Sequence, residues 1–433
     1  MTRPLALLIG GCLALTAAAV LVGLPAAAHF LAPHYSLGFA DDYNLIAKNL
    51  LEGHGYRLHA DMADTMMREP GYPLFLAALF AVLGYGIEAA RIGNLALGAA
   101  AALVVASLAR RVTRDETAAL IAVAIFLLHP GTVIATARGG VELLFILACA
   151  GFLLLLQRAI ESGRPGAYAA AGLALGAAVM VRSTPIVFPL LLLPYLVLSA
   201  PRGERARRLG LGALLVGAMI LVMVPWIARN YALSGAFVPT GTVQGVALQE
   251  GQFTCERMPL GREFKRLQDE AADDRDRLAE AAGLRFRSGY YQYFYSPADE
   301  LAYNRNLAQR ALERYRDEPA LLARCSAANL FNFWFLGKNG LATAINIAVQ
   351  LPLLAMALAG GWLLLRRRVP AERWAPVALF AACLVAVHLP VIAHARHSMP
   401  LVPYLGMFAA VALAAAWRRR SERRTPPAAP VPA

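Results

Sequence analysis

Ten apolar stretches dominate this sequence, and each is long enough to cross the roughly 30 Å hydrocarbon core of a membrane. They lie at residues 5–28, 89–109, 118–134, 141–157, 167–182, 185–200, 209–228, 341–365, 374–392 and 399–417. Hydrophobic residues make up 58% of the 433 residues and charged residues only 16%, whereas a soluble globular chain carries roughly 25% charged residues. We therefore predict an all-α polytopic membrane protein with about ten transmembrane helices.

The basic residues are distributed unevenly over this pattern. The formal net charge is +13, and nineteen arginines fall on one side when the stretches alternate across the membrane. The three short loops on the other side contain only Arg138, Arg182 and Arg396. Because loops rich in arginine stay in the cytosol, we expect both termini to be cytosolic. The excess charge is then a topology signal, and nucleic acid is not needed as a partner.

Two regions are predicted to face the exterior, residues 29–88 and 229–340. In the first, an amphipathic helix is expected at about 43–52, directly after Asp41 and Asp42, and a second apolar helix at 72–83 is too short to span the membrane. The amphipathic helix is predicted to lie in the membrane interface, with Tyr43, Ile46, Ala47, Leu50 and Leu51 on the face opposite Asn44, Lys48, Asn49 and Glu52. The second region is polar from about 249 to 316 and is expected to form a small helical cap.

These features divide the chain into four parts. They are an N-terminal transmembrane module at 1–229 with a first outer loop at 29–88, a cap at 230–340, C-terminal transmembrane helices at 341–417 and a disordered cytosolic tail at 418–433. The five cysteines lack the C-x-x-C spacing of a zinc or redox motif. A disulfide between Cys255 and Cys325 is an option that the sequence leaves open.

Charged and imidazole side chains gather at the predicted outer ends of the apolar stretches. They are Asp41, Asp42, Arg68, Arg138, Glu142, Arg182, Arg229, His394, Arg396 and His397. Ionisable groups at this depth are costly unless they are paired, hydrated or liganded. Several arginines and a few carboxylates beside an apolar interior suit a ligand with a phosphate head and a hydrocarbon tail, because guanidinium groups bind phosphate oxygens bidentately.

Each of these residues also has a plainer interpretation. Asp41 and Asp42 can be helix caps, and Arg68, Arg182 and Arg229 can extend from apolar surface toward water. The loop with His394 and Arg396 can be an ordinary interfacial loop. Glu142 is harder to explain in this way, because it opens a long apolar run.

Several short motifs, taken in order, resemble the GT-C superfamily of membrane glycosyltransferases. They are DDYNLIAKNLLEGHGY at 41–56, REPGYPLFLA at 68–77, RIGNL at 91–95, ELLF at 142–145, VRSTP at 181–185, PWIARNY at 225–231 and RHSMPLVPY at 396–404. The most similar group contains protein O-mannosyltransferases, the lipid A aminoarabinose transferase and their bacterial relatives. The resemblance implies a GT-C-like helical bundle in the bacterial cytoplasmic (inner) membrane, with juxtamembrane helices in the first outer loop and an active site facing the periplasm or exterior.

The resemblance also implies a reaction and residues for it. It implies inverting transfer of a sugar from a polyprenyl-phosphate carrier, with a first-loop carboxylate as general base. The base is then Asp41 or Asp42, of which we favour Asp41, and Glu142 matches a second acidic position. The predicted substrate-binding residues are Arg68, Arg138, Arg182, Arg229, His394, Arg396 and Tyr72. Because arginines can stabilise a phosphate leaving group by themselves, we expect no metal and no cofactor.

Two other functions remain open at this point. A transporter or flippase of a lipid-linked sugar would carry charges in the middle of its helices, and here the charges gather at one face. An acyltransferase that uses His394 or His397 would need a paired acid that the sequence does not place nearby. The sequence does not identify the sugar, the oligomeric state or the acceptor, which can be a lipid, a glycan or a protein.

Overall fold

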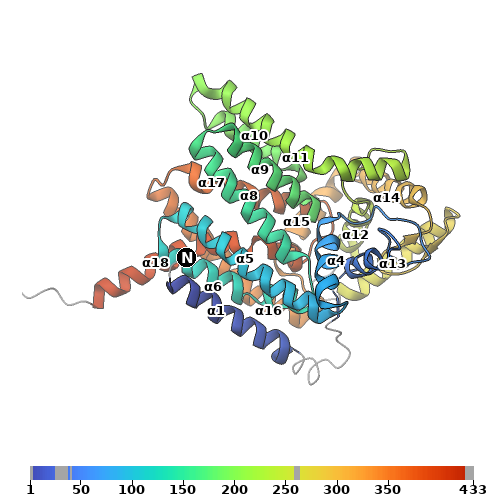
Figure 1. Cartoon of the computed structure of the whole chain (residues 1–433), viewed down its shortest axis with the longest axis horizontal. Helices are drawn as coiled ribbons and strands as arrows, with labels where there is room; N and C mark the ends of the chain where they lie inside the picture. The colour runs from blue at the N-terminus through green and yellow to red at the C-terminus, as the bar shows by residue number, and fades with distance from the viewer. Residues whose placement is uncertain (1–2, 25–37, 40, 258–263, 425–433) are drawn as a thin grey trace, which may run out of the picture.

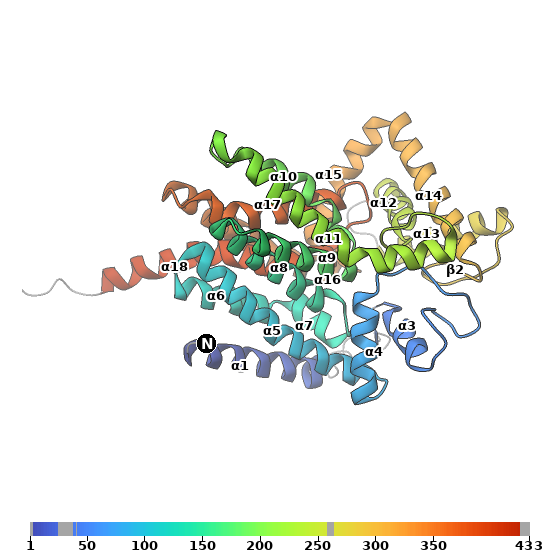
Figure 2. The ribbon, with the colours of Figure 1, turned by 45° about the horizontal axis from the view of Figure 1, so that its top comes forward.

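The structure is a computed structural model that describes residues 3–24, 38–39, 41–257 and 264–424. It is a helical bundle with a group of shorter helices at one end (Figures 1 and 2). The bundle consists of α1 (Arg3–Ala18) with the π-turn η1 (Ala19–Gly23), α5 (Ile87–Thr113), α6 (Glu116–Leu128), α7 (Pro130–Ala137), α8 (Glu142–Ser162), α9 (Pro165–Val181), η2 (Thr184–Val187), α10 (Pro189–Leu198), η3 (Arg202–Glu204), α11 (Arg205–Ser234), α16 (Gly340–Arg366), α17 (Ala371–His388), η4 (Ala395–Leu401) and α18 (Val402–Arg424).

The outer end holds the remaining elements. They are α3 (Tyr43–Leu51) and α4 (Gly71–Leu83) of the first loop, and α12 (Gln244–Arg257), α13 (Phe264–Ala281), β1 (Phe286–Arg287), β2 (Tyr293–Phe294), α14 (Pro297–Asp317) and α15 (Pro319–Phe335) of the cap. The two strands form an antiparallel hairpin in which Phe286 pairs with Phe294. The predicted all-α membrane fold with juxtamembrane helices is confirmed.

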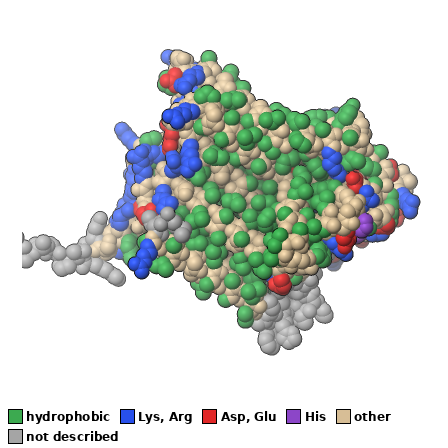
Figure 3. Space-filling view, viewed as in Figure 1, with side chains coloured by type: hydrophobic (Ala, Val, Ile, Leu, Met, Phe, Trp, Pro, Cys, Tyr) green, Lys and Arg blue, Asp and Glu red, His purple; other side chains and the backbone are tan. Residues whose placement is uncertain are grey.

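The surface supports a membrane position for the bundle. Figure 3 shows a broad hydrophobic belt, with Lys and Arg gathered at one end and charges of both signs at the cap end. Among the described residues, seven helices are long and apolar enough to cross a membrane, and the bent pair of α6 and α7 makes an eighth candidate. The ten predicted stretches therefore include two that fall on shorter apolar helices, Pro165–Val181 and Thr184–Leu198.

Prolines explain where the helices break. The pair α6 and α7 bends by 47° at His129, which is extended because it precedes Pro130. The stretch at 185–200 contains Pro185 and Pro189, which divide it into a 3₁₀ turn and a ten-residue helix. A proline lacks the N–H that helix continuation needs, so hydrophobicity alone overestimated the length of this segment.

Glycines allow helices of the bundle to approach closely. A side chain on Gly172 or Gly176 of α9 would collide with the backbone of α11 at Leu215 or Met219. Gly360 of α16 lies in the same way against Phe408 of α18. Small residues at these crossings bring backbones together where the lipid supplies no hydrophobic driving force.

The first-loop helix α3 forms at the predicted place, but its faces differ from the prediction. Asn44 and Asn49 are buried, because Asn44 donates to the Tyr85 hydroxyl at 2.9 Å and Asn49 donates to the carbonyls of Arg57 and Leu58. Leu51 is 43% exposed, as an apolar side chain on the lipid-facing side of an interfacial helix would be. The assignment of Asn44 and Asn49 to the polar face was wrong because a polar side chain can be buried when its hydrogen bonds are satisfied.

One covalent link lies within the cap, and one ion pair joins the cap to the first outer loop. A disulfide joins Cys255 of α12 to Cys325 of α15, with a Cα–Cα distance of 5.3 Å, so the pairing that the sequence left open is present. In addition, the hairpin reaches the first outer loop, where Arg287 pairs with Asp61 at 2.9 Å. At the other end of the chain, residues 418–424 of the predicted tail belong to α18, which continues to Arg424, and the rest of that tail, 425–433, lies outside the described residues.

Candidate active site

Arg396 joins two of the predicted acids at the outer end of the bundle. Its Nη1 and Nη2 donate to the two carboxylate oxygens of Asp41 at 3.1 and 2.6 Å, and its Nε donates to Glu142 at 2.5 Å. These three residues come from the first loop, the start of α8 and η4. Residues separated by more than 350 positions in the sequence therefore meet in one network, which we call the Asp41–Arg396–Glu142 network.

The members of this network differ in exposure. The side chains of Asp41 and Arg396 are 21% and 31% exposed, whereas that of Glu142 is 1% exposed. Glu142 is the first residue of α8, where a carboxylate also meets the positive end of the helix dipole. It thus lies beneath Arg396, and only Asp41 and Arg396 can meet a ligand from outside.

Charge decides the protonation state of Asp41. Burial raises the pKa of its carboxyl group, but Arg396, Arg68 and Arg182 act in the opposite direction and hold the pKa well below its usual range. Asp41 is therefore ionised at neutral pH. Its side chain does not serve as a helix cap, because both of its oxygens are bonded to Arg396.

Arg68 supplies a second buried guanidinium close to Asp41. It is 7% exposed and lies between two aromatic rings, with Cζ 5.0 Å from the ring of Tyr43 and 4.6 Å from that of Tyr291. Its Nε and Nη2 are buried without a hydrogen-bond partner. A buried charged donor that lacks a partner is costly, so this arrangement suits an anion that would accept from it.

The backbone at Arg68 is fixed by a tyrosine of the same loop. The Tyr56 hydroxyl contacts the carbonyl oxygens of Arg68 and Glu69 at 3.0 and 3.1 Å. The Tyr56 ring in turn packs on Trp226 of α11, with centroids 5.1 Å apart. These contacts hold the loop segment against the bundle, so the side chain of Arg68 is presented from a rigid base.

The hairpin of the cap closes over the first loop. Tyr293 donates to the second acid, Asp42, at 2.6 Å, and Tyr291 covers Arg68. Asp42 stands at the N-cap position of α3, but its side chain makes no capping hydrogen bond. Two of the tyrosines at 290–295 thus contact the predicted site, and the capping interpretation does not describe either acid.

The remaining predicted residues occupy different positions. Arg182 lies with Cζ 5.8 Å from the Phe145 ring, near enough to lower the pKa of Asp41. Arg138 is the C-cap residue of α7, and its Nε is buried without a hydrogen-bond partner. Arg229 lies apart from the Asp41–Arg396–Glu142 network: it donates to the Thr65 carbonyl at 3.0 Å and its Cζ is 4.6 Å from the Trp226 ring.

Tyr72 and His394 also face protein groups. Tyr72 is fully buried, and its hydroxyl donates to the Gly139 carbonyl at 2.7 Å. The His394 ring stacks on His397, with centroids 4.1 Å apart. Burial, together with the nearby charges of Arg396 and Arg182, lowers the pKa of His394 to about 3, so its imidazole is neutral at pH 7. Within the described ranges, no group of three or more His, Cys, Asp or Glu side chains is arranged to hold a metal ion.

Two buried glutamates at the junction of the first loop and the cap were not predicted from the sequence. Glu300 of α14 accepts from Thr65 at 2.6 Å, from the Met66 amide at 3.0 Å and from Thr242 at 2.5 Å. Glu69 accepts from the Gly241 amide at 3.2 Å. Both tie the first loop to the segment before α12, and neither stands in a local pattern that would distinguish it from a solvated acid.

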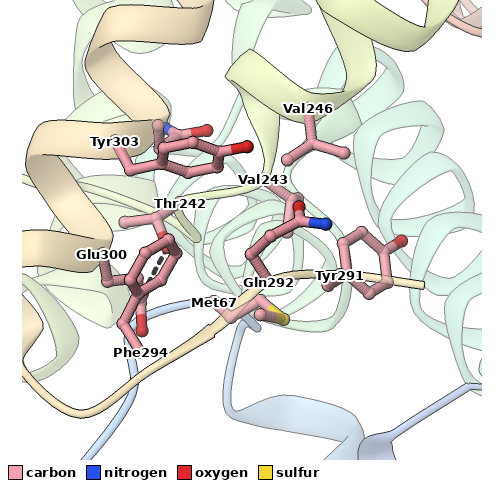
Figure 4. A pocket seen from close by; sticks show the side chains of 10 residues that line it. Met67, Thr242, Val243, Val246, Tyr291, Gln292, Phe294, Glu300 and Tyr303 are labelled. Carbon is pink, nitrogen blue, oxygen red and sulfur yellow. Dashed lines mark hydrogen bonds between the residues drawn. The ribbon is translucent and has the colours of Figure 1, made fainter. Parts of the chain in front are cut away.

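A small cavity lies at the same junction between the first loop, the hairpin and α14 (Figure 4). Figure 4 shows Glu300, hydrogen-bonded to Thr242, on one side of it and Tyr291 on the other. Tyr291 therefore separates this cavity from Arg68. The cavity has room for ordered water only, and we place no substrate in it.

A segment that includes Arg68, Tyr72, Arg138, Glu142 and Arg182 matches a known family. Residues 67–228, less than half of the chain, match the family model described as dolichyl-phosphate-mannose-protein mannosyltransferase. This match confirms the predicted resemblance: over these residues the chain is similar to a family of membrane glycosyltransferases. A search of curated proteins found no match.

Solved structures with a similar arrangement are more distant. ArnT from Cupriavidus metallidurans bound to undecaprenyl phosphate is 17% identical, with 91% of this chain and 78% of that chain covered and a TM-score of 0.40. The arabinosyltransferase EmbB from Mycobacterium smegmatis is 16% identical, with 96% and 41% covered and a TM-score of 0.34. At these TM-scores the structural likeness carries no argument. The resemblance to membrane glycosyltransferases rests on the family match over residues 67–228.

Proposed function

We propose that this protein transfers a sugar from a polyprenyl-phosphate carrier to an extracytoplasmic acceptor, with inversion at the anomeric carbon. One observation carries the proposal. The buried guanidinium of Arg68 and the partly exposed guanidinium of Arg396 lie close to the ionised Asp41 at the outer end of the bundle, and Arg68 has nitrogens without a partner. Such a site fits a phosphate whose hydrocarbon tail stays in the membrane.

The same residues divide the chemistry between them. The acceptor hydroxyl oxygen forms a bond to the anomeric carbon as the bond from that carbon to the phosphate oxygen breaks. The hydroxyl proton goes to the Asp41 carboxylate, and the arginines stabilise the negative charge that accumulates on the departing lipid phosphate. Inversion requires the base and the leaving group to lie on opposite faces of the sugar.

Substrate binding would also raise the pKa of Asp41 and so make it a better general base. A carboxylate held by Arg396 is a weak base, because that pairing lowers its pKa. A phosphate that accepts from Arg396 and Arg68 would weaken the pairing and add negative charge nearby, and both effects raise the pKa of Asp41. The base thus becomes effective when the leaving group is in place.

The side of the membrane follows from two further features. The disulfide between Cys255 and Cys325 belongs to the cap, and such bonds persist in oxidising compartments. The arginine-rich end lies at the opposite end of the hydrophobic belt (Figure 3), as expected for a cytosolic face. We therefore place the site on the periplasmic or exterior side of a bacterial inner membrane.

Transfer from synthetic donors tests this proposal directly. Purified full-length protein is offered undecaprenyl phosphate linked to mannose, arabinose or aminoarabinose, and release of undecaprenyl phosphate is followed with a membrane lipid extract as acceptor. We expect Asp41→Asn to lower turnover by about 10²–10⁴-fold, the usual contribution of a general base, and Asp42→Asn to lower it by less than about tenfold.

Undecaprenyl phosphate affinity is the companion measurement. Both variants should bind this lipid at least as well as the wild type, because each removes a negative charge near the phosphate. If Asp42→Asn shows the larger loss of turnover, Asp42 is the base. If both variants keep full turnover, the first-loop carboxylates do not act as bases and the mechanism is wrong.

A further inference from the structure

The turn between α7 and α8 is held by side chains from two other helices. Tyr72 of α4 donates to the Gly139 carbonyl at 2.7 Å, and Asn94 of α5 donates to the Gly140 carbonyl at 3.0 Å. Asn94 also donates to Ala135 at 3.2 Å and is fully buried. We call this segment, residues 139–140, the glycine turn.

The glycine turn has no space for larger residues. Gly139 adopts φ +55°, which favours glycine, and a Cβ there would approach that of Ala90 to 2.9 Å. A Cβ on Gly140 would collide with Oε2 of Glu142. The carboxylate of Glu142 therefore rests directly on the Gly140 backbone, and the position of the turn determines the position of the carboxylate.

From this geometry we infer that Tyr72 and Asn94 are positioning residues, which act through the glycine turn and Glu142 on Arg396. Glu142 is fully buried and accepts from Nε of Arg396, whose other two nitrogens hold Asp41. The direction of the guanidinium thus depends on a residue that no ligand can reach. The inference rests on the proposed function and assigns to Tyr72 a role other than substrate contact.

The chain of contacts makes a prediction about coupling. Tyr72 donates to the turn, the turn supports Glu142, and Glu142 binds Arg396. Removal of the Tyr72 hydroxyl should therefore change the site only while Glu142 is able to hold Arg396. A residue that merely stabilised the fold would have the same effect in both backgrounds, because distant independent substitutions add.

A double-mutant cycle tests this coupling. Tyr72→Phe, Glu142→Gln and the double variant are purified as full-length protein, and two quantities are measured: the Kd for undecaprenyl phosphate and the melting temperature in detergent without lipid. We expect Tyr72→Phe to weaken binding by about fivefold, equivalent to the loss of one hydrogen bond, and to have no further effect when Glu142→Gln is present. Gly140→Ala should weaken binding at least as much.

Tyr315→Phe is the matched control, because the Tyr315 hydroxyl also donates to a carbonyl, that of Pro390, at 2.9 Å. It should leave the Kd unchanged and should shift the melting temperature additively with Glu142→Gln. Non-additive melting shifts for Tyr72→Phe and Glu142→Gln support the inference without any lipid. Additive shifts overturn it, even if the lipid binds. A wild type that binds no undecaprenyl phosphate contradicts the proposed function instead.

Discussion

Two buried ion clusters at the outer end of the molecule differ in how completely they are satisfied. In the cap, Arg275 and Glu250 are fully buried 3.6 Å apart. Arg275 also donates to Gln249, Gln292 and the Tyr290 carbonyl. In the site, Arg68 retains two buried nitrogens without a partner. A satisfied cluster maintains a fold, whereas an unsatisfied one at the same membrane end is ready to bind a ligand.

Arg275→Met should produce the largest effect of all, and it should be an effect on stability. The substitution leaves Glu250 buried without its countercharge, which costs about 3–5 kcal/mol. Chemical denaturation in detergent measures this change in unfolding free energy. The control is Arg277→Met, an exposed neighbour on the same helix, which should stay within about 0.5 kcal/mol of the wild type. Equal losses of unfolding free energy in both variants would show that the buried Arg275–Glu250 pair contributes no more to stability than an exposed arginine does.

Arg68→Met should show the opposite behaviour. We expect undecaprenyl phosphate to bind about 10–100-fold more weakly, because charged hydrogen bonds contribute about 1.5–3 kcal/mol. Stability should change little, since two of the guanidinium nitrogens have no partner to lose. Binding is measured by titration of purified protein, with Arg57→Met as the control from the same loop, where Arg57 pairs with half-buried Asp64. Unchanged affinity for Arg68→Met would remove Arg68 from the phosphate site.

The fold and the site differ in how far the sequence could predict them. Apolar stretches and arginine asymmetry predicted the helical membrane fold, because both follow from local composition. The gathering of Asp41, Glu142 and Arg396 at one membrane face was expected from the topology and from the order of family motifs, but no local pattern could show that Arg396 pairs with both acids. Glu300 was missed because a buried acid on a charged cap helix has the same sequence pattern as a solvated one.

Helix lengths and helix faces were also hard to predict, because they depend on features that a hydropathy pattern does not contain. Hydropathy does not register the break at Pro130, nor the division of 185–200 by Pro185 and Pro189. Asn49 was assigned to the exposed face of α3, but three carbonyl acceptors at Leu45, Arg57 and Leu58 compensate its burial. These acceptors are supplied by the folded loop, so the pattern of the helix alone could not indicate them.

Two tyrosines three positions apart allow a finer comparison. Tyr290 donates to Glu250 in the cap cluster, whereas Tyr293 donates to Asp42 in the site. Tyr290→Phe should lower the unfolding free energy by about 1–3 kcal/mol, because it leaves a buried acceptor with fewer donors. Tyr293→Phe should leave stability nearly unchanged and alter turnover by less than about tenfold. Denaturation and sugar transfer, measured on both variants, separate these outcomes; a reversal of the two effects would contradict the division between clusters.

The smallest expected effect is a difference between the two clusters in how the melting temperature depends on pH. Burial raises the pKa of Glu250 above 4.5, although Arg275 acts against it. A raised carboxyl pKa in the folded state stabilises the protein at low pH, and this contribution is lost as the pH rises through that pKa. The melting temperature of the wild type, relative to Glu250→Gln, should therefore fall as the pH increases from 5 to 7.

Asp41 should behave differently over the same interval. The arginines hold its folded-state pKa below the usual range despite the effect of burial, so its contribution is complete above a pH of about 4 and is lost only at more acidic pH. The melting temperature relative to Asp41→Asn should stay constant between pH 5 and 7. If this difference falls with pH as much as the Glu250 difference does, the folded-state pKa of Asp41 is raised above its usual range. Its pairing with Arg396 would then be too weak to outweigh the effect of burial, and the binding of a phosphate could not be what activates it.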